Sequence, residues 1–226
     1  HIRNFGRRPR SFWLPECAYE PGLERYLADA GIKVFFVETH LVTGGHARGK
    51  ALGGVLGPYS EMGRELSIEE TVEVPSTYGT TFKPYHVGRT DVSVLARNER
   101  TGRQVWSAAH GYPGDPAYRE FHKKDAQTGL HYWRVTGPHV DLGDKDFYDP
   151  AAASGMANQH AQHFVGVVRS ELESYRSGAG EPGIVMASYD TELFGHWWLE
   201  GVEWLEGVIR GAAADPEIEL VTAGEY

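Results

Sequence analysis

The chain has 226 residues, of which 41% are hydrophobic, and this is enough for one sizeable domain with a buried core. Its formal net charge is −9, and its one basic cluster, residues 7–10, is short, which argues against nucleic acid or an anionic membrane as the main partner. No apolar run approaches the roughly 20 residues of a membrane-spanning helix. The single cysteine, Cys17, excludes a framework of internal disulfides and is typical of a reducing compartment, so we expect a cytoplasmic protein.

Aromatic residues make up 12% of the chain, with six Trp and twelve Tyr, and 28 residues are Gly. Acidic α/β chains that are rich in aromatic residues and glycine often bind sugars, because flat rings stack on the apolar faces of pyranoses. The composition therefore favours a carbohydrate-binding protein.

The first predicted strand is a short apolar run at residues 12–14, which Pro15 ends because its ring removes a backbone donor and fixes φ. Glu16 then lies at the C-terminal end of a strand, where α/β barrels place their chemistry. Together with Trp13 it gives a carboxylate beside an aromatic ring, which suits a sugar site. The alternative is that Glu16 caps the helix that Pro21 opens.

A helix is predicted over residues 22–30 and the next strand over 32–37. His40 follows this strand and is either a residue of the site's rim or an ordinary loop histidine. Residues 41–83 are rich in Gly, Thr and Ser and show weak periodicity, so they are predicted to form a long loop insertion. Loops of this length inside a compact domain are often functional.

Several short elements are predicted between this loop and the longest helix. They are a β segment at 81–87, a buried strand at 92–96, short helices at 101–106 and 118–122, and a strand or extended segment at 131–135.

The longest helical pattern covers residues 151–176. A predicted strand at 183–187 follows and leads to Asp190, and a helix over 195–214 and a last strand over 217–222 complete the chain. Strands that alternate with helices in this way are typical of a parallel α/β sheet. We therefore expect an α/β fold with parallel strands and with helical and loop insertions.

Two carboxylates, Glu16 and Asp190, each follow a predicted strand. On a parallel barrel both would lie on the same C-terminal rim, which is what the hydrolysis or transfer of glycosidic bonds requires. One carboxylate attacks the anomeric carbon, and the other, its pKa raised by burial or by its neighbour's charge, protonates the leaving oxygen. Retention of configuration needs the two groups roughly 5–5.5 Å apart.

The residues around both carboxylates resemble known motifs. Residues 13–19 and 189–198 are similar to the two catalytic motifs of glycoside hydrolase family 57, and residues 104–107 and 111–115 resemble its 1,4-α-glucan branching enzymes. The resemblance runs through essentially the whole chain. It implies an incomplete (β/α)7 barrel and a retaining mechanism with Glu16 as nucleophile and Asp190 as general acid/base.

Other motifs of the family have no counterpart in this sequence. The His-Gln-Pro motif near the N-terminus, the Thr-His strand before the nucleophile, the last motif and the helical region after the barrel are all missing. We therefore expect residues 1–226 to be one segment of a catalytic barrel that is truncated at both ends. The segment would come from the middle of a larger enzyme. This departure puts the independent activity of the chain in question.

Further site residues are expected from the same resemblance and from their positions. Trp106 matches a tryptophan on which the substrate stacks in the branching enzymes, against the alternative of a core residue. His196 is positioned to bond a sugar hydroxyl or to start a helix. Trp197 and Trp198 cannot share one side of a helix, so one belongs to the core and the other, which we take to be Trp198, reaches the cleft. Trp13 completes the expected aromatic lining.

Other chemistries find less support in the sequence. His160 and His163 have the spacing of zinc ligands, but no further ligand is arranged nearby, and a structural pair is the simpler interpretation. Cys17 lacks the surroundings of a thiol protease. The glycines of residues 53–57 do not follow a strand and lead into a helix as a phosphate-binding loop would. No metal or cofactor is expected.

The expected function is an α-glucan transglycosylase that forms α-1,6 branches on α-1,4-glucan, as in glycogen biosynthesis. The alternatives are a 4-α-glucanotransferase or an α-amylase-type hydrolase of the same family, or a glucan-binding fragment without catalysis. In the family's branching enzymes, a loop tyrosine over the cleft separates transfer from hydrolysis. Tyr59, Tyr78 and Tyr85 are the candidates for this residue here.

Overall fold

The structure is a computed structural model that describes residues 1–44, 46–48, 71–73, 79–106 and 111–226. Most of the loop predicted over 41–83, with Tyr59 and Tyr78, lies outside the described residues. At its edges, β3 (His46–Arg48) and β4 (Thr71–Glu73) pair as antiparallel strands. Tyr85 accepts a hydrogen bond from the backbone of Thr80, 2.7 Å away.

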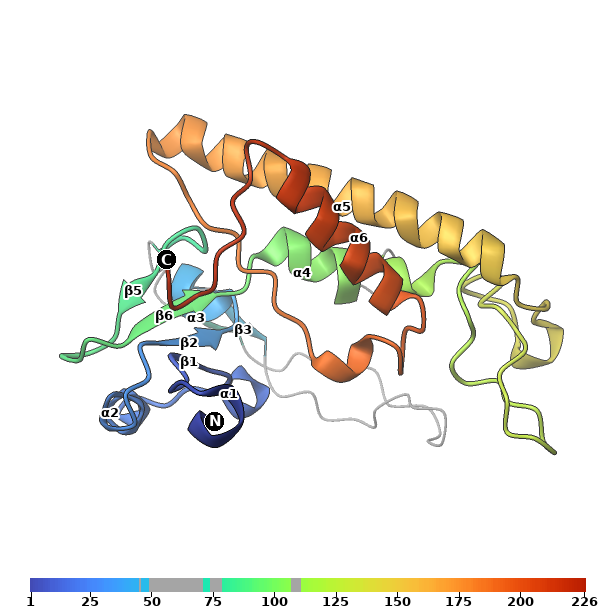
Figure 1. The fold of residues 1–226 in the computed structure, drawn as a ribbon, viewed down its shortest axis with the longest axis horizontal. Coiled ribbons are helices and arrows are strands. Elements are labelled where there is room, and N and C mark those ends of the chain that lie inside the picture. The colour runs from blue at the N-terminus through green and yellow to red at the C-terminus, as the bar shows by residue number, and fades with distance from the viewer. Residues whose placement is uncertain (45, 49–70, 74–78, 107–110) are drawn as a thin grey trace.

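A four-stranded sheet, in the order β1-β2-β6-β5, forms one end of the molecule (Figure 1). The strands β1 (Ser11–Phe12), β2 (Val34–Val37) and β6 (Ser93–Ala96) run parallel, and β5 (Tyr85–His86) is antiparallel to β6. The apolar residues of β2 and β6 are buried, apart from the half-buried Phe36, as expected for parallel strands. The parallel sheet predicted from the sequence is confirmed.

Two predicted strands are absent from the described structure. Residues 183–187 run extended beside the sheet, but among the described residues only two backbone bonds tie them, from the Ile184 amide to the Phe82 carbonyl and from the Asn98 amide to the Met186 carbonyl. Residues 217–222 form no strand either. In both cases an apolar run is present without the ladder of hydrogen bonds that defines a strand.

Two long helices, α5 (Pro150–Ala179) and α6 (Gly201–Ala214), pack along each other above the sheet (Figure 1). Asp149 caps α5 by accepting bonds from two backbone amides, and Gly180 ends it in the left-handed conformation. The helices approach closely at Gly207 because this residue has no side chain. A β-carbon there would lie only 2.7 Å from the β-carbon of Ala161. In the part of the chain that is described, no helix is long and apolar enough to cross a membrane.

The remaining helices are short. They are α1 (Ile2–Phe5), α2 (Leu23–Asp29), α3 (His40–Thr43) and α4 (Glu99–Trp106), with 3-10 turns at Pro15–Cys17, Tyr112–Gly114, Leu142–Asp144 and Thr191–Leu193.

The helix predicted over 118–122 is wrong. Arg119 instead bridges Arg134, and Trp133 bridges Phe147, so residues 111–149 form an irregular insertion at the end of the molecule opposite the sheet (Figure 1). Turn residues and long-range bonds override the local helical pattern here.

Candidate active site

Glu16 lies in the 3-10 turn Pro15–Cys17, directly after β1 and Trp13–Leu14. Its backbone has φ 54° and ψ 25°, and Cys17 follows at φ 51°. Two consecutive non-glycine residues in the left-handed region are unfavourable and tend to occur where function requires them. Glu16 does not cap α2, because the amide of Gly22, at the start of that helix, donates its hydrogen bond to Glu24 at 2.7 Å. The side chain of Glu16 is exposed and free for chemistry.

The next two parallel strands also end in charged residues. Glu38 follows β2 and Arg97 follows β6, and their side chains form an ion pair of 3.1 Å. The backbone of Arg97 continues the sheet through a bond to Val37, and the Thr39 hydroxyl donates to the Arg97 carbonyl at 2.7 Å. Three neighbouring strands therefore carry Glu16, Glu38 and Arg97 at one edge of the sheet.

Asp190 is held at the same edge by residues after β6. The amide of Asn98 donates to the Met186 carbonyl, and Arg97 Nε donates to the Ser188 hydroxyl at 3.3 Å. The Tyr189 hydroxyl donates to the Thr101 carbonyl at 2.8 Å. Asp190 itself is exposed.

The pKa of the Cys17 thiol depends on the charged groups at this edge. Burial, which leaves Cys17 only 4% exposed, raises its pKa, and the negative charge of Glu38 raises it further. Asp190 and Glu16 act in the same direction, whereas Arg97 lowers the pKa. The charges of all four groups therefore act on the pKa of the Cys17 thiol.

A cavity of about 780 Å³ opens between this edge and α4. Glu38 and Arg97 line it, as does Trp106, which is 38% exposed at the end of α4. Glu16 and Asp190 are not among its lining residues, so the cavity does not include the two carboxylates. Its other lining residues are polar or small, namely Thr39, Glu99, Arg100, Gly102, Arg103 and Gln104.

The structure corrects the expectation for Trp198. Its side chain is 1% exposed and packs with Tyr112, Tyr118 and Trp204, so it has no face on which a sugar could stack. The helix predicted from 195 begins only at Gly201, and the preceding turn directs Trp198 into the core. Trp197 is 54% exposed and is the tryptophan of this pair that faces solvent.

The other predicted site residues are all accessible. Trp13 is 37% exposed and lies against Phe36, with ring centroids 5.9 Å apart. His40 is exposed at the start of α3, and His196 is exposed with its ring nearly perpendicular to that of Phe121. Their contact with substrate stays a prediction.

Arg97 and Glu38 lie at this edge and are not among the site residues predicted from the sequence. A signal was present for both, since each directly follows a strand with a largely buried apolar run. The ion pair between them links strands that are far apart in the chain, and only the fold shows it.

His160 and His163 have tyrosine partners. The Tyr118 hydroxyl lies 2.7 Å from His160 Nδ1, and the Tyr112 hydroxyl lies 2.6 Å from His163 Nδ1. Among the residues that the structure describes, no group of three or more His, Cys, Asp or Glu side chains is arranged to hold a metal ion.

Comparison with known proteins assigns the chain to a family. The model of glycosyl hydrolase family 57 matches residues 2–226. A 1,4-alpha-glucan branching enzyme of Thermococcus kodakarensis is 43% identical over 223 residues, which cover 92% of this chain and 30% of that protein. A probable 1,4-alpha-glucan branching enzyme of Mycobacterium tuberculosis is 39% identical over 207 residues, which cover 92% of this chain and 33% of that protein. The chain thus spans about a third of the length of these curated relatives.

Solved structures give the same result. The crystal structure of the Thermococcus branching enzyme matches with a TM-score of 0.81 and 40% identity, over 99% of this chain and 40% of that one. The α-amylase AmyC of Thermotoga maritima matches with a TM-score of 0.75 and 28% identity, over 99% of this chain and 41% of that one. The sheet is therefore part of an incomplete (β/α)7 barrel, and the resemblance seen at residues 13–19 and 189–198 is confirmed. The chain belongs to glycosyl hydrolase family 57.

Proposed function

We propose that the chain is the catalytic segment of a retaining transglycosylase that forms α-1,6 branches on α-1,4-glucan. The observation that carries this proposal is that the exposed Glu16 follows β1, while the segment of the exposed Asp190 is bonded to Arg97 and Asn98 directly after β6. The names of the relatives, branching enzymes at 43% and 39% identity, support the type of product.

In the proposed mechanism Glu16 attacks the anomeric carbon of an internal α-1,4 linkage while Asp190 donates a proton to the departing chain. The bond from the anomeric carbon to the leaving oxygen breaks as the bond to the Glu16 carboxylate forms. Asp190, now a base, then removes the proton of an acceptor's 6-hydroxyl, which displaces Glu16 and creates the branch.

The substrates under this proposal are amylose, glycogen and maltooligosaccharides. Trp106 and Trp13 would stack on glucose units, and His40 and His196 would bond sugar hydroxyls. Transfer exceeds hydrolysis only where the site excludes water and orients an acceptor. We place the reaction in glycogen biosynthesis in the cytoplasm, which the single cysteine and the acidic composition support.

A second candidate function is hydrolysis or 4-α-glucan transfer. The similarity to the α-amylase AmyC favours it, since 99% of this chain matches that structure. A glucan-binding fragment without catalysis is a third, because the chain covers about a third of the relatives.

The test is incubation with amylose, followed by debranching of the product and chain-length analysis. We expect new α-1,6-linked chains from the wild type and a loss of about a thousandfold or more in Glu16→Gln and Asp190→Asn. The matched control is Glu20→Gln, an exposed glutamate near Glu16, which should keep full activity. Shorter linear glucans alone would indicate the hydrolase or glucanotransferase. Unchanged amylose with retained glucan binding would indicate the binding fragment.

A further inference from the structure

The segment that carries Asp190 has little regular structure to hold it. Residues 183–190 belong to no helix or strand, and the Asp190 side chain makes no capping hydrogen bond to the 3-10 turn Thr191–Leu193 that follows. A general acid must nevertheless reach the leaving oxygen within hydrogen-bond distance, and a displacement of about 1 Å can lower the rate about a hundredfold. The direction of the Asp190 carboxylate therefore depends on the residues next to it in the chain.

Tyr189, the residue directly before Asp190, is fixed at both ends of its side chain. Its ring meets the rings of Phe194 and Trp204 nearly at right angles, at 6.1 and 6.3 Å between centroids. Its hydroxyl donates to the Thr101 carbonyl in α4 at 2.8 Å. Burial raises the pKa of this hydroxyl, so it stays protonated and remains a donor.

A fixed Tyr189 sets the direction of Asp190. Successive side chains of an extended chain point to opposite sides, and Asp190 is extended, with φ −65° and ψ 132°. The exposures agree, since Tyr189 is half-buried and Asp190 is exposed. The hydroxyl bond of Tyr189 thus turns the neighbouring carboxylate away from the core and toward solvent.

The acceptor of this bond is itself held firmly. Thr101 is fully buried in the first turn of α4, and its amide donates to Asn98 Oδ1 at 2.9 Å. Asn98 is also buried, and it donates through its backbone amide to the Met186 carbonyl at 2.9 Å and through Nδ2 to Glu171 on α5 at 3.2 Å. The start of α4 is therefore a buried junction between the end of β6, α5 and the segment before Asp190.

The same helix forms a wall of the cavity. Residues 102–104 and Trp106 of α4 line it, and Trp106 is the last residue of the helix. One rigid helix therefore holds both a wall of the cavity and the partner of the Tyr189 hydroxyl. Through this helix the Asp190 carboxylate keeps a fixed position relative to a ligand in the cavity.

We propose that Tyr189 is the positioning residue of the general acid/base, and that its hydroxyl bond to α4 aligns Asp190 with the leaving oxygen. This role of Tyr189 rests on the proposed function, which makes Asp190 the general acid/base. Tyr189 touches no reacting atom. Its removal should therefore affect only the steps in which Asp190 donates or removes a proton.

The test compares two substrates that differ in their need for a proton, in the wild type and in Tyr189→Phe. Cleavage of amylose needs Asp190 to protonate the departing oxygen. With α-maltotriosyl fluoride and azide, the carbon–fluorine bond breaks as the bond to Glu16 forms, and fluoride leaves without a proton. Azide, an anion with no proton to lose, then displaces Glu16.

We expect Tyr189→Phe to lower kcat for amylose about tenfold to a hundredfold, with KM within about threefold of the wild type. Fluoride release in azide should keep about the wild-type rate. Asp190→Asn should show the same selective loss with a larger magnitude, whereas Glu16→Gln should lose both reactions.

The matched control is Tyr118→Phe, which also removes a buried tyrosine hydroxyl, one that lies 2.7 Å from His160 Nδ1. It should leave both reactions within about twofold of the wild type. If Tyr189→Phe does not fold, Asn98→Ala, which removes the side-chain bond at the start of α4, takes its place and should show the same selective loss.

Equal losses in the two reactions of Tyr189→Phe would overturn the positioning role, because they would indicate a general loss of folding or binding. An unchanged kcat for amylose would overturn it as well. The two proposals can fail separately. If the wild type shortens amylose without forming α-1,6 linkages, the proposed function fails, while the ratio of the two rates in Tyr189→Phe still decides the role of Tyr189.

Discussion

At the scale of single residues, Cys17 offers a direct test of how the site is assembled. As the chain's one cysteine, it gives a thiolate absorbance that can be titrated without interference from another thiol. Glu38, Asp190 and Glu16 raise its pKa, so Glu38→Gln and Asp190→Asn should each lower that pKa, and Arg97→Met should raise it. The exposed Glu20→Gln serves as control and should not change it. If the pKa of Cys17 is the same in Asp190→Asn as in the wild type, Asp190 does not lie at this edge.

Arg97 leads to a second prediction at this scale. It pairs with Glu38 and donates to Ser188, and through Ser188 it positions the segment of Asp190. We expect Arg97→Met to lower branching activity about tenfold to a hundredfold, because the Asp190 carboxylate loses its support. Arg97→Lys should recover only part of the loss, since one ammonium cannot replace a guanidinium that bonds two partners at once.

The measurement for Arg97 is kcat and KM for amylose together with maltoheptaose binding. A positioning role predicts that kcat falls while binding persists. The exposed Arg210→Met on α6 is the control and should match the wild type. Equal loss of binding and kcat would instead make Arg97 a residue that holds substrate.

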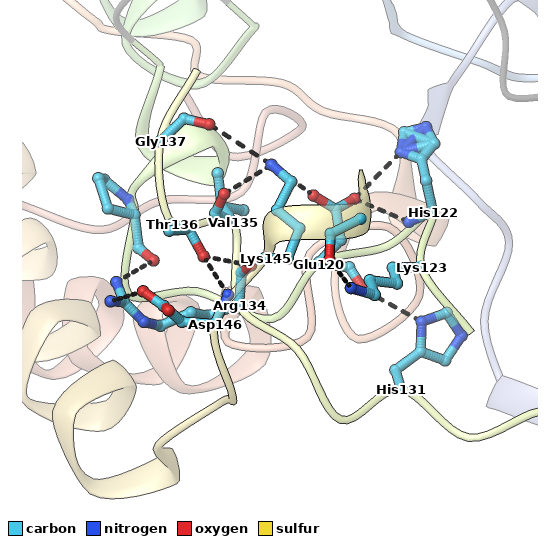
Figure 2. A network of polar contacts seen from close by, with 12 residues as sticks. Glu120, His122, Lys123, His131, Arg134, Val135, Thr136, Gly137, Lys145 and Asp146 are labelled. Atoms are coloured by element: carbon cyan, nitrogen blue, oxygen red, sulfur yellow. Dashed lines mark hydrogen bonds and ion pairs between the residues drawn. The ribbon is translucent and has the colours of Figure 1, made fainter. Parts of the chain in front are cut away.

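At the scale of elements, the 111–149 insertion contains a buried ion pair between Glu120 and Lys145 (Figure 2). Lys145→Met leaves the nearly closed Glu120 carboxylate without its ammonium partner and with only its contacts to His122, so we expect a loss of about 3–5 kcal/mol in the free energy of unfolding. Denaturant titration measures it. Arg210→Met, which removes an exposed pair on α6, should cost under about 1 kcal/mol. The double variant Glu120→Leu/Lys145→Met should be more stable than Lys145→Met alone, and the opposite order would contradict this explanation.

At the scale of the whole molecule, stability should fall as the pH drops below about 6.5. His160 on α5 joins the helical layer to Tyr118, and burial lowers its pKa from 6.5, although the charge of Asp115 opposes the shift. Below pH 6.5 the unfolded chain therefore binds a proton that the folded chain does not yet accept, and the free energy of unfolding decreases.

Melting temperatures from pH 8 to 5.5 test this prediction. Between pH 8 and 5.5 the melting temperature of the wild type should fall more than that of His160→Asn, whose new side chain does not titrate in this range. The melting temperature of His139→Asn, a change at an exposed histidine, should fall as much as that of the wild type. Parallel curves for the wild type and His160→Asn would remove His160 as the cause.

The sequence by itself determined the family, the parallel strands β2 and β6, the long helix α5 and the position of Glu16 after a strand. These features are local. An apolar run, a proline stop or a helical period acts over a few residues, so it can be read without knowing what lies opposite.

Only the tertiary structure decided which neighbours those elements meet. It placed Trp198 in the core and Trp197 outside, joined Arg97 to Glu38 and Ser188, and replaced the helix predicted over 118–122 with an insertion held by Glu120. Each of these outcomes depends on residues distant in the chain, because burying a large apolar side chain contributes about 1.5–3 kcal/mol, whereas helix propensities of ordinary residues differ by under about 1 kcal/mol. A pattern in the sequence shows that a side chain can be buried or paired, and the packed fold selects its partner.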